Sequence, residues 1–415
     1  MKRLLRLAVT AVLLLPVAGC GGDDEETATS TATTAPAVKS YDKSVAGVVE
    51  AAEAFLATLD DDQKTEAQLE LTQENAVSWS NLPCGSTCRP GISFGDLDDS
   101  QLAAAKSVLK TALGAQTGSG YERVEQLLLA DDYLADAQGS STGSSGGPGG
   151  GMSGGPPAGM SGGPGGMSGG PPDGGMMSGG PGGGSSGSPG GGSGGTGGYG
   201  SGLYYLAFLG TPSTTGTWEL NFGGHHLAVH MSYKSGEVVG ASPYFVGVEP
   251  TSWTDDSNAT HTPLGDMKDA MLAMLDGLSD AEQSKAKLSQ SFSDVLVGPQ
   301  EDGQFPATKQ GLAVSTLTDD QKDLVLAAIK PWVAGADDAT ATSLLATYEG
   351  ELDKTYVGWS GTTGLDTHAD YVRIDGPSVW VEFVCQNGVV IQNQIHYHTV
   401  YRDHTRDYGG EFSFS

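Results

Sequence analysis

A long low-complexity stretch in the middle of the chain limits which residues can build a core. Residues 139–202 are composed mainly of Gly, Ser, Pro and Met, with Asp173 as their only charge. This composition predicts a flexible, disordered insert. Its five methionines recur in near-copies of Met-Ser-Gly-Gly, and thioethers can capture copper(I). We favour an insert without a ligand, so that the fold must come from the two flanking segments.

The N-terminus has the pattern of a secretory signal. Met1-Lys2-Arg3 leads into a short apolar run that ends with small residues before Cys20. The run is too short for a permanent membrane helix, and its end resembles a bacterial lipobox, in which the signal is removed and the cysteine acylated. We therefore predict a signal peptide at residues 1–19, then a lipidated Cys20 and a flexible acidic tether at residues 20–45. The protein would lie outside the cytoplasm, anchored to the bacterial cell membrane; secretion with an unmodified Cys20 is the alternative.

The net charge limits the possible binding partners, and the cysteines indicate one disulfide. The formal net charge is −29, which repels phosphate backbones and excludes nucleic acid as a partner. Cys84 and Cys88 bracket a three-residue loop, and outside the cytoplasm a disulfide between them is expected. A redox pair or half of a zinc site is the alternative. Cys385 lies in an apolar run and is predicted to be a buried small hydrophobic residue.

Four segments share one helix-start pattern. In each, Asp, Ser or Thr is followed three residues later by Gln or Glu, which is the spacing of a capping box. A Gly-aliphatic pair stands seven residues before the second start of each pair of segments, at Gly91-Ile92 and Gly311-Leu312. This predicts two related helical units around a β-rich centre, with chance similarity as the alternative. The four starts are Asp60/Gln63, Asp98/Gln101, Ser279/Glu282 and Thr318/Gln321.

Strand patterns fall into two blocks, at residues 203–248 and 371–401. In the second block, Asn387-Gly388 between apolar runs predicts a tight hairpin turn. Helices and strands come in separate runs, which is typical of an α+β fold with an antiparallel sheet. We expect both blocks to join one sheet. The two helical units would flank it in a single domain, residues 46–415, interrupted by the insert.

Most histidines lie in the two strand blocks. His396 and His398 are two residues apart, so both imidazoles should leave one face of a strand. Two imidazoles on one face are half of a divalent-metal site, and His225-His226 in the first block can supply the rest. Because neighbouring strand residues point to opposite faces, only one of that pair should join, with His225 the better candidate for the core. A hydrogen-bonded polar cluster and unrelated surface histidines remain alternatives.

Glu382 is the obvious carboxylate near these histidines. It interrupts an apolar strand, where a buried charge needs a partner. A two-residue turn at Asn387-Gly388 would pair it with Asn393, on the face opposite His396 and His398. A bulge or a three-residue loop would reverse the face, and an ion pair with an arginine such as Arg373 is a further alternative.

Several segments together resemble an uncharacterised bacterial family known as domain of unknown function 3500. The resemblance covers about residues 46–415 apart from the insert, and the region 387–394 is longer than in the family pattern. It supports the fold and the site but implies no activity. The segments that carry it include Phe208-Leu209-Gly210-Thr211-Pro212, Gly224-His225-His226-Leu227, Pro243-Tyr244-Phe245 with Gly247, Arg373-Ile374-Asp375-Gly376-Pro377, Glu382, His396 to Asp403, and Asp407-Tyr408-Gly409.

Two functions follow as hypotheses. The first is a metal-dependent hydrolase in which His396, His398 and His226 or His225 hold zinc, copper or iron. Glu382 or Asp403 would be the general base, and Arg402 would stabilise negative charge. The second is a surface lipoprotein that binds a small ligand or a metal without turnover, with aromatic residues such as Trp218 and Tyr397 stacking on the ligand. A structural module of the cell envelope is a third possibility.

Overall fold

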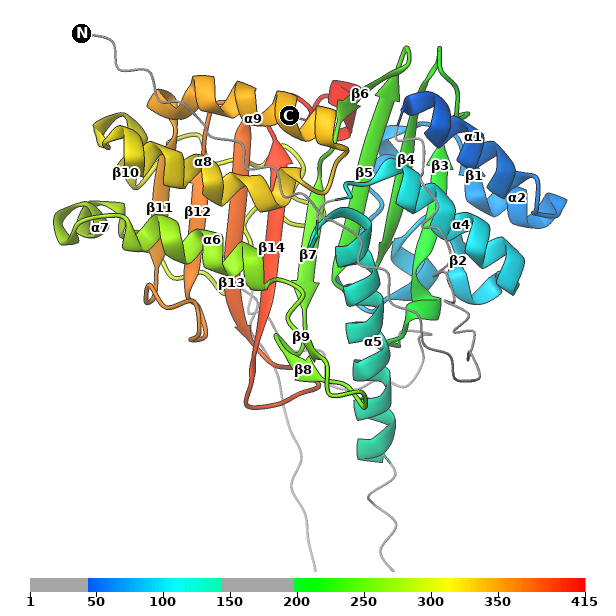
Figure 1. Cartoon of the computed structure of the whole chain (residues 1–415), viewed down its shortest axis with the longest axis horizontal. Helices are drawn as coiled ribbons and strands as arrows, with labels where there is room; N and C mark the ends of the chain where they lie inside the picture. Colours follow the sequence, from blue (N-terminus) through cyan, green and yellow to red (C-terminus); the bar gives the residue numbers. More distant parts are fainter. Residues whose placement is uncertain (1–43, 116, 143–197, 415) are drawn as a thin grey trace, which may run out of the picture. The chain divides into compact units, whose positions relative to one another are not determined.

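The computed structural model describes residues 44–115, 117–142 and 198–414 (Figure 1). The predicted signal peptide, Cys20 and nearly all of the tether lie outside the described residues. The predicted insert at 139–202 overlaps them at both ends, because a helix continues to Thr142 and the description resumes at residue 198. Within the described part, no helix has the length and apolarity needed to cross a membrane.

A single large sheet contains both predicted strand blocks. Its order is β1-β3-β4-β5-β7-β14-β13-β12-β11-β10, with β2 beside β3 and β6 beside β5. Every pairing except that of β1 with β3 is antiparallel. The α+β class and the single sheet are therefore confirmed. The strands are β1 (Gln68–Leu69), β2 (Ile92–Ser93), β3 (Tyr205–Leu209), β4 (Thr217–Gly224), β5 (Leu227–Lys234), β6 (Glu237–Gly240), β7 (Tyr244–Val248), β10 (Leu312–Ala313), β11 (Tyr356–Ser360), β12 (Tyr371–Asp375), β13 (Val379–Asn387) and β14 (Ile395–Asp403); β8 (Trp253–Thr254) and β9 (Thr260–His261) form a separate hairpin.

Helices cover one face of this sheet, with one helical group over each half (Figure 1). All four predicted capping boxes are present. The two boxes of each pair also touch, since Gln101 donates to Gln63 at 2.8 Å and Gln321 donates to Glu282 at 2.9 Å. The α-helices are α1 (Val45–Leu56), α2 (Asp61–Ala67), α3 (Gln73–Ala76), α4 (Asp99–Ala112), α5 (Gly120–Thr142), α6 (Gly265–Asp276), α7 (Asp280–Ala286), α8 (Asp319–Val333) and α9 (Asp338–Glu351).

The two halves of the chain repeat one plan, as the helix starts predict. From β3 and from β11 the sheet order runs inward through equivalent strands until β7 meets β14. Gly91 and Gly311, which begin the Gly-aliphatic pairs, have φ values of +109° and +101°. A Cβ atom at either would clash with a backbone carbonyl, that of Leu206 or that of Val357. Each glycine therefore lets its segment join the edge of its half-sheet.

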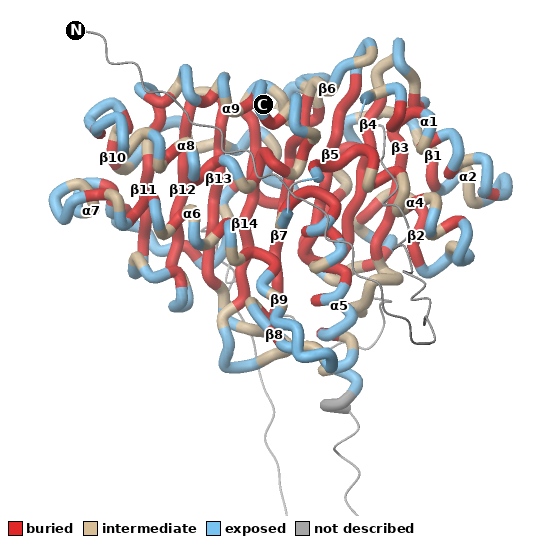
Figure 2. Tube along the Cα trace, in the orientation of Figure 1, coloured by how far each residue is buried: buried red, intermediate tan, exposed pale blue. Residues whose placement is uncertain are grey.

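Loops, together with the short helix α3, cover the second face of the sheet. Trp79 packs there with Phe245 and Val400, and Phe292 packs with Tyr371. The strands are buried along most of their length because both faces are covered (Figure 2). This loop-covered face carries an unusual number of buried polar side chains, which include Glu219, His230, Arg373, Glu382, His396, His398 and Arg402.

The hairpin between β13 and β14 differs from the predicted one. Asn387 pairs with Ile395, so residues 388–394 form the loop and a two-residue turn at Asn387-Gly388 is wrong. One carboxylate oxygen of Glu249 accepts the backbone amides of Val389, Val390 and Ile391, which holds this longer loop. Glu382 now pairs with Val400 and therefore shares a face with His396 and His398.

Candidate metal centre

Three buried imidazoles converge at one end of the loop-covered face. His226 lies in the turn between β4 and β5, and His396 and His398 lie on β14. One ligand nitrogen from each falls within 4.8 Å of the others. The Nε2 atoms of His226 and His398 are 3.1 Å apart. Two nitrogens that bind one tetrahedral zinc at about 2.0–2.1 Å are separated by roughly 3.3 Å, so the arrangement matches a metal site.

The backbone of the β4–β5 turn brings His226 into this group. Gly224 pairs with Leu227, so His225 and His226 are the two turn residues and do not alternate as strand residues would. His226 has a φ of 61°, a left-handed conformation that is uncommon for any residue with a side chain. Gly247 provides the space, because a Cβ there would lie 2.9 Å from His226 Cδ2 and 3.0 Å from His398 Cδ2.

The imidazoles open into a cavity of about 530 Å³. Its wall contains loop residues from both halves of the chain, among them Asn81, Asp294 and Val389. His225 also lines the cavity, and its ring stacks on His226 with centroids 3.7 Å apart. The site is thus a concave pocket with imidazoles in its wall, as expected of a ligand-binding or catalytic centre.

The environment favours the neutral form of His226 and of His396, which is the form that binds metal. Burial lowers the pKa of His226 well below its usual value, and the neighbouring His225, His398 and His396 lower it further. Burial, followed by the charge of His398, lowers the pKa of His396 to about 3. The Nδ1 atom of His396 is buried without a hydrogen-bond partner among the described residues. Uncompensated buried nitrogen atoms of this kind are costly unless an ion satisfies them.

His398 has two polar neighbours that select different tautomers. Its Nδ1 lies 2.9 Å from Oδ1 of Asp294 and 3.0 Å from Nε2 of Gln386. If Nδ1–H donates to Asp294, Nε2 keeps a lone pair for a metal; if Nδ1 accepts from Gln386, Nε2–H points at His226. Burial raises the pKa of Asp294, but the interactions with His398, together with hydrogen bonds from the Val295 amide and from Gln386, outweigh it and keep that pKa below its usual value. The ionised Asp294 therefore favours the metal-binding tautomer.

His225 is held differently from the three convergent histidines. Its Nδ1 lies 2.6 Å from Oδ1 of Asp131, a buried carboxylate on α5, and its backbone carbonyl accepts the hydroxyl of Tyr204. It lies in the cavity wall but does not belong to the group of three. The structure brings together both histidines of the pair, where sequence alternation predicts only one.

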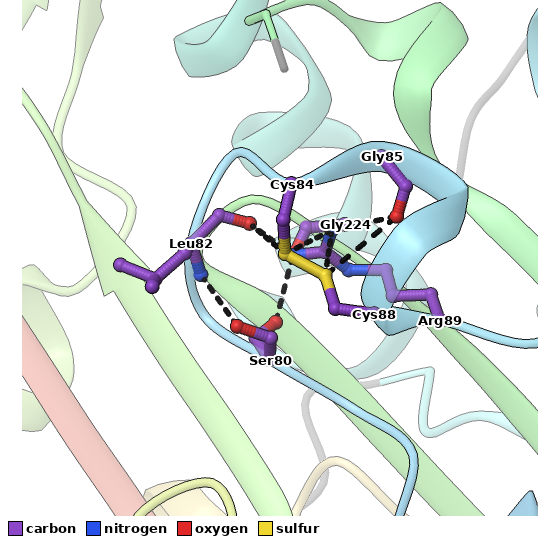
Figure 3. Close-up of a disulfide and its surroundings, with 7 residues drawn as sticks. All are labelled: Ser80, Leu82, Cys84, Gly85, Cys88, Arg89 and Gly224. Atoms are coloured by element: carbon purple, nitrogen blue, oxygen red, sulfur yellow. Dashed lines mark hydrogen bonds between the residues drawn. A yellow bond between two sulfur atoms is a disulfide. The ribbon is translucent and has the colours of Figure 1, made fainter. Parts of the chain in front are cut away.

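A disulfide joins Cys84 and Cys88, as predicted, with Cα atoms 6.0 Å apart (Figure 3). Arg89 reaches over it, so that Nη1 contacts both sulfur atoms while Nη2 donates to the carbonyls of Ser80, Leu82 and Gly224. Gly224 directly precedes the histidine turn. Arg89 therefore ties the disulfide loop, which borders the cavity, to the backbone that presents His226. Cys385 is buried and unpaired in β13, also as predicted.

Glu382 and Arg402, predicted as catalytic residues, lie beneath the cavity and do not line it. The Glu382 carboxylate accepts from the amides of Leu296 and Val297, from the hydroxyl of Tyr371 and from the indole of Trp380. Arg402 donates to the carbonyls of Val297 and Gly298 and to Asp302 and Asp407. Both side chains therefore anchor the loop 294–302, which forms one wall of the cavity.

Asp403, the third predicted catalytic residue, points away from the site. It pairs with Val379 one residue beyond Arg402, so its side chain faces the helices. There it accepts from the hydroxyl of Tyr348 and from Arg406. The aromatic residues considered for stacking, such as Trp218 and Tyr397, are buried in the main core instead.

Four site residues escape the sequence prediction, namely Asp131, Asn81, Gly247 and Asp294. Asp131 and Asp294 are far from the histidines in the chain and come from a helix and an irregular loop, so periodicity gives no signal for them. Gly247 belongs to the family pattern, beside Pro243-Tyr244-Phe245. Its place in that pattern is the only sequence signal that could have pointed to it as a site residue.

The family described as "Protein of unknown function (DUF3500)" matches residues 41–410. No curated protein and no solved structure matches the chain.

Proposed function

Because the chain belongs to the DUF3500 family, whose function is unknown, we propose its function from the site alone. We infer that His226, His396 and His398 bind one divalent transition-metal ion and that the protein is a metal-dependent enzyme, of which a hydrolase is the best-supported type. The observation that carries this proposal is the convergence of three buried imidazoles within 4.8 Å in the wall of an accessible cavity.

The donor set suits zinc, copper or iron, since imidazole is a good ligand for all three. Three protein ligands also leave one position of a tetrahedral ion for water or substrate, which is the arrangement of catalytic zinc sites. Such an ion, when bound, would supply a nucleophile by lowering the pKa of a water molecule that it binds. Three carboxylates line the cavity; Glu249 already accepts three backbone amides, so Asp294 and Glu301 are the ones available to accept a proton.

Metal or ligand binding without turnover is the second candidate function. It is favoured by one observation: the predicted catalytic residues Glu382 and Arg402 are saturated with structural hydrogen bonds under the loop 294–302. A binding protein needs the cavity and the ion but no catalytic base. Turnover of a scissile substrate by the metal-loaded protein, and its loss on metal removal, separates the two candidates.

We propose further that the protein works outside the cytoplasm, with Cys20 acylated after removal of residues 1–19. The lipobox-like end of the N-terminal segment and the Cys84–Cys88 disulfide support this location. The test is fractionation of cells that make the full chain. Membrane association that is lost in Cys20→Ser supports the anchor, and an unchanged distribution contradicts it.

The metal proposal is tested on residues 21–415, purified without a histidine tag and analysed by plasma mass spectrometry after metal reconstitution. We expect about one zinc, copper or iron ion per chain, and loss of that ion in His396→Ala/His398→Ala. His261→Ala is the matched control, because His261 lies in the separate β8–β9 hairpin with Asp255. Absence of metal from the parent protein, or equal loss in the control, would overturn the proposal.

A further inference from the structure

The mouth of the cavity carries large apolar side chains that remain exposed. Among the described residues only five large hydrophobic side chains are exposed. Two of them, Leu82 and Val389, line this cavity and are 59 % and 65 % exposed. A third, Leu296, directly follows the lining residue Val295 in the chain but does not itself line the cavity. Exposed apolar groups gathered at a concave site indicate binding of an apolar group.

Each of these three residues lies on backbone that a buried charged side chain holds. Arg89 donates to the carbonyl of Leu82. Glu382 accepts the amide of Leu296. The amide of Val389 donates to Glu249. The apolar rim is thus presented on fixed loops, and a ligand that uses it loses little free energy in ordering the protein.

The charges of the cavity argue against an anionic ligand. Glu249, Asp294 and Glu301 line it, and none of its described lining residues is lysine or arginine. Sites that recognise phosphate or carboxylate groups depend on such cations. A single divalent ion in the histidine site would be offset by the carboxylates, which leaves no positive charge for an anionic substituent.

We propose that this site takes neutral or positively charged amphiphilic molecules: a polar group reaches the ion, and an apolar part lies on Leu82 and Val389. This rests on the proposed function, because the polar group is recognised by the metal at the three histidines. It adds that the ligand carries an apolar portion and lacks a second negative charge.

Four N-substituted imidazoles test the proposal, because they share one metal-binding nitrogen and differ only in the substituent. The protein, residues 21–415 loaded with Co²⁺, is titrated with 1-methylimidazole, 1-butylimidazole, 1-(3-aminopropyl)imidazole and 3-(imidazol-1-yl)propionate, and binding is followed in the visible spectrum of the cobalt. We expect 1-butylimidazole to bind about tenfold more tightly than 1-methylimidazole, since partial burial of three methylene groups gives roughly that factor. The propionate should bind at least tenfold more weakly than the aminopropyl compound.

Val389→Ser should reduce the butyl preference to about threefold and leave 1-methylimidazole unaffected. Leu129→Ser is the matched control, because Leu129 is 49 % exposed on α5 and does not line the cavity. Equal affinity for the methyl and butyl compounds, tight binding of the propionate, or the same loss in Leu129→Ser would overturn the proposal. If one of these contrary results appears in a protein that binds Co²⁺ stoichiometrically, only the proposal of an amphiphilic ligand fails. If Co²⁺ does not bind, the proposed metal site fails as well.

Discussion

Replacing Asp294 by asparagine separates a metal site from a merely polar histidine cluster. In the tautomer that the ionised Asp294 favours, Nδ1–H of His398 donates a hydrogen bond to Asp294 and the Nε2 lone pair faces His226. An asparagine amide can instead donate to Nδ1, and the amide of Gln386, 3.0 Å from Nδ1, suits the same tautomer. Asp294→Asn therefore favours the tautomer whose Nε2 carries a hydrogen and cannot bind an ion.

The expected effect is a 10- to 100-fold loss of metal affinity, which corresponds to about 1.4–2.8 kcal/mol. The stability of the metal-free fold should change little, because the Asp294 side chain is 47 % exposed. The assay is competition for zinc between the protein and a chromophoric chelator at pH 7, with urea unfolding of both metal-free proteins as the check on folding.

A second substitution makes the result specific. Gln386→Glu places an acceptor near the same Nδ1 atom, so the double variant Asp294→Asn/Gln386→Glu should recover most of the lost affinity. An Asp294→Asn protein that binds zinc within twofold of the parent refutes the role of Asp294. A loss that Gln386→Glu does not repair would show that the tautomer argument is wrong.

Three further predictions concern the support of the site. Gly247→Ala should weaken metal binding more than tenfold in chelator competition, because its Cβ would press on the rings of His226 and His398; unchanged affinity would contradict the close packing. Glu382→Gln should lower the free energy of unfolding by about 3–6 kcal/mol in urea titrations, because a glutamine side chain can accept from only two of the four donors that Glu382 now satisfies. Metal stoichiometry at low temperature should be retained. A variant that keeps its stability and loses only activity would make Glu382 catalytic instead. The folded-state pKa of His396, about 3, lies below the ordinary value of 6.5, so the unfolded chain gains the proton first and metal-free stability falls as the pH drops below 6.5. We expect about 2–3 kcal/mol of loss by pH 4.5 and a flatter profile in His396→Gln; identical profiles would refute the buried neutral histidine.

The helical part of the fold is readable in the sequence because its signals are local. A capping box requires two side chains three residues apart, and all four predicted boxes form. The glycines before Ile92 and Leu312 are visible in the sequence because each stands seven residues before a helix start, although the positive φ that requires them depends on the folded chain. The repeat of these local signals was enough to predict two related units.

The face of Glu382 could not be predicted because it depends on a contact distant in sequence. Asn387-Gly388 is a good turn signal, but the carboxylate of Glu249 holds three successive amides after it and extends the loop to residue 394. An odd change in loop length moves every following side chain to the other face. Asp131 and Asp294 escaped prediction for a related reason, because only the folded chain brings them to His225 and His398.

The duplicated plan provides an internal comparison for the metal site. The amide of Gly247 donates to the carbonyl of His226 at 2.7 Å, and at the other end of the sheet the amide of His404 donates to the carbonyl of Ser378 at 2.8 Å. The two sites thus share one backbone hydrogen bond, but the turns differ, because His226 has a positive φ and Ser378 does not. One site has a histidine in the turn and a glycine facing it, whereas the other has a serine and a histidine. The left-handed turn at His226 and the side chains at 226 and 247 therefore distinguish the metal site from its counterpart. A glycine that leaves room for two imidazoles is therefore as much a part of the proposed centre as the imidazoles themselves.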